Sequence, residues 1–141
     1  MVQRSTNANN IIANVIGAHN STGRTQTVYD PACGSGSLLL KVAGEATRGI
    51  SIYGQELDNA TAALAAMNMW LHSKPDAEIK KGQSTLSNPQ FLNKGGLKTF
   101  NYVVANPPFS TKAWRNGFNP EEDLYDRFTG FGIPPSKNGD Y

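Results

Sequence analysis

The sequence predicts an α/β fold in which helices flank a mostly parallel sheet. Apolar, β-prone runs lie at residues 27–29, 50–56 and 102–105, and a helical pattern follows each of the first two. Strands that alternate with helices in this way favour a parallel sheet. The first run leads into a glycine-rich turn, and the third leads into Asn-Pro-Pro-Phe at residues 106–109. Because ligands of open α/β sheets bind at the carboxyl ends of the strands, we expect a ligand site at that edge.

A helix is predicted over residues 9–18, before the first strand. Its apolar residues recur at helical spacing and form one stripe. This stripe consists of Ile11, Ile12, Val15 and Ile16.

The glycine-rich turn lies between the first strand and a helix that is expected to begin near Ser37. Gly34 and Gly36 allow the backbone to turn tightly and to approach a ligand without a Cβ in the way. The helix start offers unpaired N–H groups to the same ligand. A nicotinamide turn is disfavoured because Leu39 occupies a position that must be small, and no Gly-Lys-Ser/Thr follows as in a P-loop. A nucleoside cofactor without a pyrophosphate therefore remains.

The strand at residues 50–56 ends in an acidic residue. Glu56 follows Gly36 by 20 residues. This is close to the spacing at which an acid at the end of the second strand meets ribose hydroxyls. Glu56 is therefore a candidate ribose ligand.

The helix after this strand is predicted to run to about His72, with Asp58 or Asn59 as its N-cap. Its apolar residues recur at i, i+4, i+7 and i+11, so we expect them to face the sheet. Residues 77–81 predict a third strand, whose charged and polar neighbours suit an edge position. The expected sheet-facing stripe consists of Ala60, Leu64, Met67 and Leu71.

The run at residues 102–105 predicts a buried strand that ends at Asn-Pro-Pro-Phe. Proline has a fixed φ, and Pro108 also biases Pro107 towards extended ψ, so the direction of the Pro107 carbonyl is preset. The Asn106 amide and this carbonyl suit the binding of a planar amino group by two acceptors, and the Phe109 ring suits stacking on the same group. A proline-rich turn without a ligand is the alternative.

Composition restricts the remaining function classes. The 141 residues fit one ordinary domain, and the net charge of +2 is compatible with nucleic acid without arguing for it. We find no signal peptide or transmembrane run, and one cysteine gives no internal disulfide, so we expect a cytoplasmic protein without membrane contact. His19 and His72 have no spaced partner, so no metal site is expected. Cys33 is interpreted as a packing residue rather than a nucleophile.

The two principal motifs resemble those of a known family. The segments at residues 30–36 and 106–109, in this order and spacing, look like the cofactor and catalytic motifs of amino-group adenine-specific DNA methyltransferases. The resemblance is closest to the modification subunit of type I restriction-modification systems, because stretches at residues 53–56, 85–89 and 127–137 also match it. It implies a Rossmann-like, S-adenosylmethionine-dependent methyltransferase fold, with a mostly parallel sheet and flanking helices.

The resemblance also implies S-adenosylmethionine as the cofactor. Asp30 and the glycine turn would face its methionine part, Glu56 its ribose hydroxyls and Leu57 its adenine ring. The expected cofactor-binding residues are Thr6, Asp30, Pro31, Ala32, Cys33, Gly34, Gly36, Ser37, Leu38, Glu56, Leu57, Gln83, Ser84 and Asn106.

The chain departs from the family pattern at both ends of this site. The usual aromatic-Thr-Pro stretch keeps Thr6 but lacks its proline, and Gln83 or Ser84 stands where an acid often contacts the cofactor adenine. The family fold has seven strands, and about four can be placed here. We therefore expect a truncated fold, with residues 1–141 as one partial catalytic-core domain and residues 110–141 as an irregular region on the target side.

The same resemblance implies that the protein methylates the N6 amino group of adenine at a specific DNA sequence. The target adenine would be flipped out of the duplex, its amino group would donate to the Asn106 side chain and the Pro107 carbonyl, and its ring would stack on Phe109. Methyl transfer is then a direct in-line displacement that depends on positioning more than on a general base. The expected catalytic residues are Asn106, Pro107, Pro108 and Phe109, and the expected DNA contacts are Lys112, Arg115 and Arg127 to phosphates and Trp114 to the flipped base.

The partners implied are duplex DNA, a specificity subunit that reads the site, a second modification subunit and, in some systems, a restriction subunit. The setting would be a bacterial or archaeal cytoplasm. Two other classes stay open. One is a methyltransferase that acts on RNA or on a protein glutamine, since Asn-Pro-Pro-aromatic also presents amino or amide nitrogens in those enzymes. The other is a non-catalytic fragment that keeps the cofactor pocket or only the fold.

Overall fold

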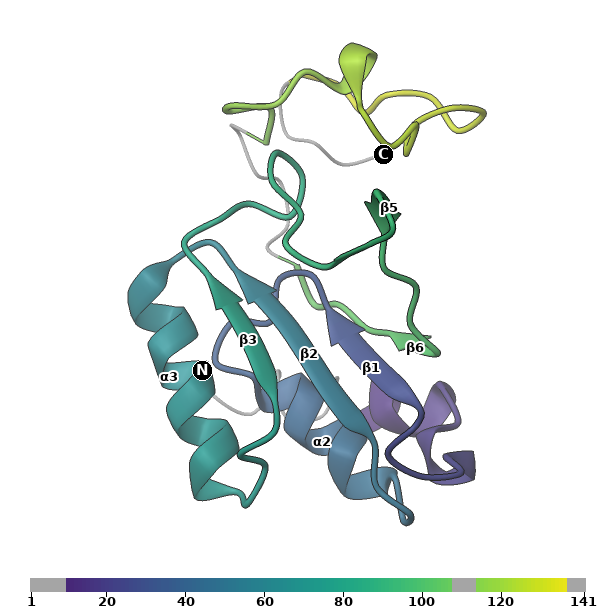
Figure 1. Cartoon of the computed structure of the whole chain (residues 1–141), viewed down its shortest axis with the longest axis vertical. Helices are drawn as coiled ribbons and strands as arrows, with labels where there is room; N and C mark the ends of the chain where they lie inside the picture. Colours follow the sequence, from purple (N-terminus) through teal and green to yellow (C-terminus); the bar gives the residue numbers. More distant parts are fainter. Residues whose placement is uncertain (1–9, 108–113, 137–141) are drawn as a thin grey trace.

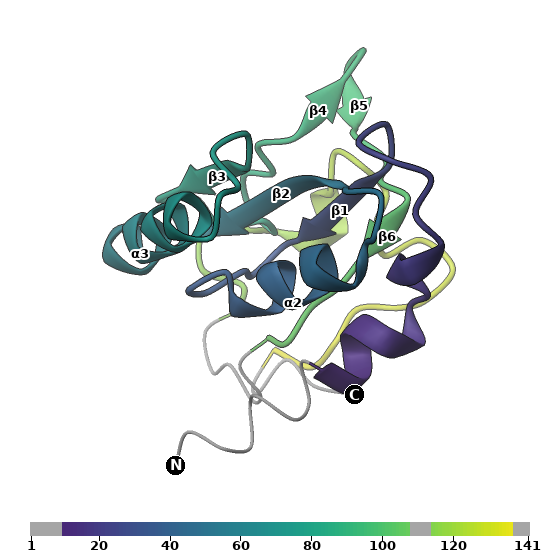
Figure 2. The same cartoon turned by 90° about the horizontal axis from the view of Figure 1, so that it is seen from below.

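A computed structural model describes residues 10–107 and 114–136 of the chain. Within these residues, helices pack on one face of a central sheet and a short hairpin projects on the side of the other face (Figures 1 and 2). Four predicted site residues lie outside the described residues, namely Thr6, Pro108, Phe109 and Lys112.

The central sheet has four parallel strands in the order β3-β2-β1-β6. Residues of β1 pair with β2 from Thr27 opposite Ser51 to Asp30 opposite Gly54. The carboxyl ends of β1, β2 and β3 therefore meet at one edge of the sheet (Figure 1). This arrangement confirms the predicted parallel α/β sheet, with the third strand at an edge. The strands are β1 Thr27–Asp30, β2 Ser51–Glu56, β3 Glu78–Lys81 and β6 Tyr102–Val103.

The helices α2 (Ser37–Glu45) and α3 (Asn59–Leu71) lie on the same face of the sheet (Figure 2). Asp58 is the N-cap of α3, as predicted, and its side chain accepts a hydrogen bond from the backbone N–H of Thr61 at 2.7 Å. None of the helices in the described part combines the length and the apolar character that a membrane crossing requires. The core between helices and sheet includes Val28, Leu39, Val42, Ile52, Ala65 and Met69.

The predicted sheet-facing stripe of α3 is wrong. Ala60 is exposed, and Leu64, Met67 and Leu71 are 54%, 60% and 77% exposed. The buried stripe consists instead of Ala62, Ala65 and Met69. A Cβ placed on Gly36 would lie 2.6 Å from Met69 Cε and 3.5 Å from Ala65 Cβ, so α3 packs closely against the glycine turn. The small alanines permit this approach, which the bulkier apolar stripe would prevent.

The first helix also differs from its prediction. Residues 10–15 are helical, and a 3-10 turn, η1, follows at Ala18–Asn20. Gly17 lies between them with φ of 73°, a left-handed conformation that interrupts the helix. Ile11 and Val15 are 62% and 78% exposed, whereas Ala13 is buried and Ile12 and Ile16 pack, partly buried, against the core. Two of the four residues of the predicted stripe therefore contact the core.

The hairpin of β4 (Leu92–Asn93) and β5 (Gly96–Leu97) was not predicted. Lys94 and Gly95 join its strands and both have positive φ, of 49° and 84°. Two central residues with positive φ are typical of the two-residue turns that match strand twist. The Lys-Gly-Gly segment was the one indication of a turn in the sequence. Strands of two residues are too short to show an alternating apolar and polar pattern, so the hairpin itself could not be predicted.

An aromatic cluster lies on the sheet face opposite the helices. Tyr29 stacks on Phe100 with ring centroids 4.5 Å apart, and Tyr53 meets Phe91 edge-on at 5.4 Å. Lys98 places its Nζ 3.8 Å from the centroid of the Tyr53 ring. These rings stabilise the segment that returns from the hairpin to β6.

The strand before Asn-Pro-Pro-Phe is shorter and more exposed than predicted. β6 contains two residues, and Val103 is 58% exposed while Val104 is buried. Among the described strands β6 pairs with β1 alone, so its outer side is a sheet edge. At this sheet edge the apolar run is covered on one face alone, so Val103 is exposed although its neighbour Val104 is buried.

Residues 114–136 lie beyond the carboxyl ends of the strands (yellow-green in Figure 1). They include one 3-10 turn, η2, at Pro120–Glu122. Phe118 contacts the rings of Trp114 and Phe128, with centroid distances of 6.4 and 5.8 Å. This segment therefore has a small aromatic cluster of its own.

Candidate active site

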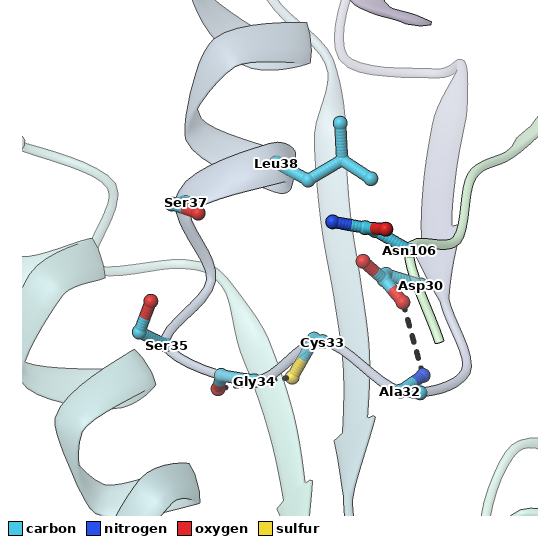
Figure 3. A pocket seen from close by; sticks show the side chains of 8 residues that line it. All are labelled: Asp30, Ala32, Cys33, Gly34, Ser35, Ser37, Leu38 and Asn106. Atoms are coloured by element: carbon cyan, nitrogen blue, oxygen red, sulfur yellow. Dashed lines mark hydrogen bonds between the residues drawn. The ribbon is translucent and has the colours of Figure 1, made fainter. Parts of the chain in front are cut away.

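A cavity of about 160 Å³ opens where β1 runs into α2 (Figure 3). Asn106, which follows β6, reaches the same cavity, and its side chain lies near those of Asp30 and Leu38 (Figure 3). The fold therefore brings the glycine turn and the first residue of Asn-Pro-Pro-Phe together. Pockets for whole drug-sized ligands usually enclose roughly 300–1,000 Å³, so this cavity suits one part of a larger ligand. Its lining residues are Asp30, Ala32, Cys33, Gly34, Ser35, Ser37, Leu38 and Asn106.

The glycine turn has the backbone conformation that its sequence requires. Gly34 and Gly36 have φ of 53° and 78°, where side chains other than glycine are strained. Gly36 is also the N-cap of α2, and as a glycine it makes no side-chain cap hydrogen bond. The N-terminus of α2 therefore presents its backbone and the positive end of its dipole to the cavity.

Asp30 is the buried acid of the cavity. It is 2% exposed, and its Oδ1 accepts a hydrogen bond of 2.9 Å from the backbone N–H of Ala32. Burial raises its pKa to about 6, and the nearby charge of Glu56 acts in the same direction. None of the residues that line the cavity is basic. The part of the cavity at Asp30 therefore favours a positively charged group, whereas the N-terminus of α2 favours a negatively charged one.

Glu56 connects the end of β2 to the turn after β1. Its Oε2 accepts from the backbone N–H of Gly34 at 2.9 Å, and its Oε1 accepts from the N–H of Asp58 at 3.0 Å. Each carboxylate oxygen can accept a further bond. Leu57, the next residue, is 63% exposed. The strand end thus offers a fixed acid and an apolar side chain next to the cavity.

Cys33 is a packing residue in this structure. It is 5% exposed, and burial raises the pKa of its thiol to about 12, so a reactive thiolate is disfavoured. A Cβ on Gly54 would lie 2.9 Å from its Sγ. Gly54 therefore makes room in β2 for the thiol beneath the turn.

The loop at residues 83–90 contacts the glycine turn. Gln55 holds this loop by hydrogen bonds, and the sequence analysis did not predict that role. Gln55 is fully buried, and its Nε2 donates to the carbonyls of Gln83 and Asn88 at 3.1 and 3.0 Å. Its Oε1 accepts from the backbone N–H of Gln90 at 3.0 Å. An uncharged polar residue at an inward position of a strand was the available signal, because such a group must be hydrogen-bonded when buried.

The two residues of this loop that were predicted to contact the cofactor adenine form hydrogen bonds within the loop itself. Gln83 Oε1 accepts from Asn88 Nδ2 at 3.0 Å, and Ser84 Oγ accepts from the N–H of Leu86 at 3.2 Å. Thr85 connects the loop to the glycine turn, because its Oγ1 donates to the Pro31 carbonyl at 2.6 Å.

The described DNA-contact candidates have partners within the chain. Trp114 Nε1 donates to the carbonyl of Pro135 at 2.8 Å, and Arg115 Nη2 donates to that of Pro134 at 3.1 Å. Arg127 pairs with Asp123 at 2.7 Å. The described residues contain no group of three or more metal-ligating side chains.

The chain is similar to one known protein family and to several of its members. The sequence model of a family described as N-6 DNA Methylase matches residues 6–141. The methylase subunit of type I restriction enzyme MpnII from Mycoplasma pneumoniae is 44% identical over 92 residues, which cover 59% of this chain and 17% of that subunit. The methylase subunit of type I restriction enzyme HindI from Haemophilus influenzae is 32% identical over 120 residues, which cover 81% of this chain and 25% of that subunit.

The fold also matches a solved structure. The crystal structure of a type I restriction-modification methyltransferase subunit from Streptococcus thermophilus aligns with a TM-score of 0.72 and 26% sequence identity. The alignment covers 92% of this chain and 27% of that subunit. The chain thus spans between 17% and 27% of the length of these three relatives.

Proposed function

Because the chain belongs to the N-6 DNA methylase family, we propose that it carries the cofactor and catalytic motifs of a DNA adenine-N6 methyltransferase that uses S-adenosylmethionine. The family inferred from the two motifs and the predicted methyltransferase fold are both confirmed. The observation that carries the proposal is the position of Asn106 beside Asp30 at one cavity. This position brings an acceptor for an amino group next to a cofactor turn. The matched family favours DNA over an RNA or protein-glutamine target.

The methionine part of the cofactor is proposed to bind in the cavity at the glycine turn. The cofactor carries a positive sulfonium and a positive ammonium group, and Asp30 supplies a buried negative charge when it is ionised. Pro31, Ala32, Cys33, Gly34, Gly36, Ser37 and Leu38 form the turn and helix start around it, and Thr6 is proposed for the carboxylate end.

The nucleoside part is proposed to lie along the ends of β2 and β3. Glu56 accepts the ribose hydroxyls with lone pairs that Gly34 and Asp58 leave available. Leu57, which is exposed beside it, covers the adenine ring. Gln83 and Ser84 border the same ring from the next strand end.

The catalytic motif is proposed to hold the target amino group. Asn106 and the Pro107 carbonyl accept its two N–H bonds, which directs the nitrogen lone pair towards the methyl group. The cofactor, when bound, would supply the methyl carbon from its sulfonium sulfur, and the amino nitrogen would release one proton to solvent. Pro108 and Phe109 are proposed to complete the motif.

The macromolecular partners follow from the family and are proposals for this chain. Duplex DNA is the substrate, with Lys112 and Arg115 near phosphates and Trp114 near the flipped base. A specificity subunit, a second modification subunit and a restriction subunit are the proposed protein partners, because the matched relatives are subunits of type I restriction enzymes.

Calorimetric titration of the chain with S-adenosylmethionine tests the proposal. We expect micromolar binding that is lost in Glu56→Ala. Transfer of a labelled methyl group is then measured on adenine-containing duplex DNA, ribosomal RNA and a release-factor substrate, and Asn106→Ala should lower transfer to DNA at least 100-fold. A folded chain that binds no cofactor would show that the motifs serve here only as a scaffold.

A further inference from the structure

Arg127 has contacts that the DNA-phosphate prediction does not explain. Its Nε and Nη2 donate to both carboxylate oxygens of Asp123, with distances between 2.7 and 3.1 Å. Its Nη1 donates to the Thr85 carbonyl at 3.1 Å, and its Nη2 donates to the Leu86 carbonyl at 2.6 Å. Each of its three guanidinium nitrogens is therefore engaged inside the chain.

Asp123 fixes the orientation of this guanidinium. Its side chain is 4% exposed, and Oδ2 also accepts from the backbone N–H of Arg127 at 2.7 Å. The Arg127 side chain is 20% exposed, and its guanidinium carbon lies 5.1 Å from the Phe118 ring centroid. A guanidinium that is paired with a carboxylate and packed near an aromatic ring is a poor phosphate ligand. A phosphate would first have to displace the Asp123 carboxylate.

The carbonyls that Arg127 binds belong to the loop that supports the cofactor turn. Thr85 accepts from Arg127 through its carbonyl and donates to the Pro31 carbonyl through its hydroxyl. Gln55 holds the same loop from the sheet side, through Gln83 and Asn88. Loop 83–90 is thus fastened between β2 and residues 114–136.

We propose that Arg127 is a positioning residue that keeps loop 83–90, and through Thr85 the turn at Pro31, in the geometry that binds S-adenosylmethionine. The proposal rests on the proposed function for the identity of the cofactor. It gives residues 114–136 a role in the cofactor site in addition to any contact with DNA. The planar fork of arginine suits this role, because its contacts use Nε, Nη1 and Nη2, whereas the three donors of a lysine ammonium share one nitrogen.

Arg127→Lys and Arg127→Gln separate this role from a phosphate contact. If Arg127 positions the loop, both variants raise the Kd for S-adenosylmethionine about tenfold, since neither side chain reproduces the fork. If Arg127 binds phosphate, Arg127→Lys keeps most DNA affinity, and Arg127→Gln lowers the slope of log affinity against log salt by about 0.9. Cofactor affinity then stays unchanged, which would overturn the proposal.

Asp123→Asn has a different expected effect under each role. If the Asp123–Arg127 pair supports the loop, the variant weakens cofactor binding. If Arg127 binds phosphate, the variant releases the arginine and strengthens DNA binding. The matched control is Arg24→Gln, which removes the same charge from an exposed pair with Asp76. It should leave the Kd for the cofactor within twofold of the unaltered chain. Thermal melts exclude general unfolding of each variant.

Amide hydrogen exchange tests the positioning role without any ligand. The N–H of Asn88 bonds to the Ser84 carbonyl, and the N–H of Cys33 bonds to the Gln55 carbonyl. Exchange at both should be at least fivefold faster in Arg127→Lys and unchanged in Arg24→Gln. If the unaltered chain binds no cofactor, the proposed function fails while this readout still decides the role of Arg127. Unchanged exchange at Asn88 and Cys33 would overturn the positioning role.

Discussion

The backbone N–H of Gly34 donates to the carboxylate of Glu56 at 2.9 Å, so the end of β2 is tied to the turn after β1. These two residues belong to separate motifs in the sequence. Their contact sets the position of the proposed ribose acid relative to the proposed methionine pocket. Glu56 therefore has a structural role in addition to its proposed contact with the cofactor.

Replacement of Glu56 should separate these two roles. Glu56→Gln keeps one of the two acceptor oxygens but loses the charge, so it should weaken cofactor binding at least tenfold and lower Tm less than Glu56→Ala does. Glu56→Ala removes both acceptors of backbone N–H groups and should also destabilise the fold by about 1–3 kcal/mol. Calorimetric titration and thermal melts measure both effects. Equal Tm values for the two variants would contradict the structural role.

Asp30 should make the stability of the chain depend on pH. Its pKa is about 6 in the folded state and about 3.8 when exposed, so the unfolded chain loses this proton first as pH rises. Its contribution to stability is fully present below pH 4 and is lost as pH rises through about 6. Asp30→Asn should therefore stabilise the chain at pH 7.5 by about 1–3 kcal/mol, as measured by urea unfolding. A variant less stable than the unaltered chain at that pH would contradict this.

The same carboxyl should control cofactor affinity. A protonated Asp30 offers no charge to the cationic cofactor, so the affinity of the unaltered chain should rise as pH increases through about 6. Asp30→Asn should bind weakly, with no such rise. Titrations between pH 5 and pH 8 measure both profiles. Parallel profiles in the two proteins would assign the pH dependence to another group.

A side chain at Gly54 should destabilise the fold as long as Cys33 packs against this position. A methyl group at Gly54 would lie 2.9 Å from Cys33 Sγ and 3.0 Å from Ile79 Cδ1, so Gly54→Ala should destabilise by about 1–3 kcal/mol. Combination with Cys33→Ala should recover part of this loss, which a double-mutant cycle measures. Gly44 is the control: it lies in α2, where an added Cβ would have no atom within 4 Å apart from its chain neighbours and the nearby backbone of the helix. Gly44→Ala should therefore stabilise by about 0.5–1 kcal/mol.

Gln55 should be a sensitive position outside the proposed contact residues. Gln55→Leu leaves the Gln83 carbonyl and the N–H of Gln90 without this partner and removes one of the two donors to the Asn88 carbonyl, at a cost of about 2–5 kcal/mol. Urea unfolding measures this loss. Gln90→Ala, which removes one exposed hydrogen bond of 3.3 Å, should change stability by less than about 0.5 kcal/mol. Similar losses in both variants would argue against Gln55 as the support of the loop.

The parallel sheet, the glycine turn and the cap of α3 could be predicted from the sequence, because each rests on residues close together in the chain. Gly34, Gly36 and Asp58 impose local backbone conformations through missing side chains or a local hydrogen bond. The family could be predicted for a related reason, since both motifs are short and contiguous. The side of α3 that faces the sheet could not, because Ala65 and Met69 are selected by the shape of the turn they pack against.

By itself, the sequence determined the fold class, the order of the motifs and the family, because short-range conformational preferences and contiguous motifs encode them. Only the tertiary structure decided that Glu56 binds Gly34, that Gln55 holds loop 83–90 and that Arg127 pairs with Asp123. The first two contacts join residues from separate elements, and the third forms where Asp123 and Arg127 meet loop 83–90. Such contacts form because folding removes polar groups from water. Each buried group then needs a hydrogen-bond partner, and the tertiary structure decides which partner lies within reach.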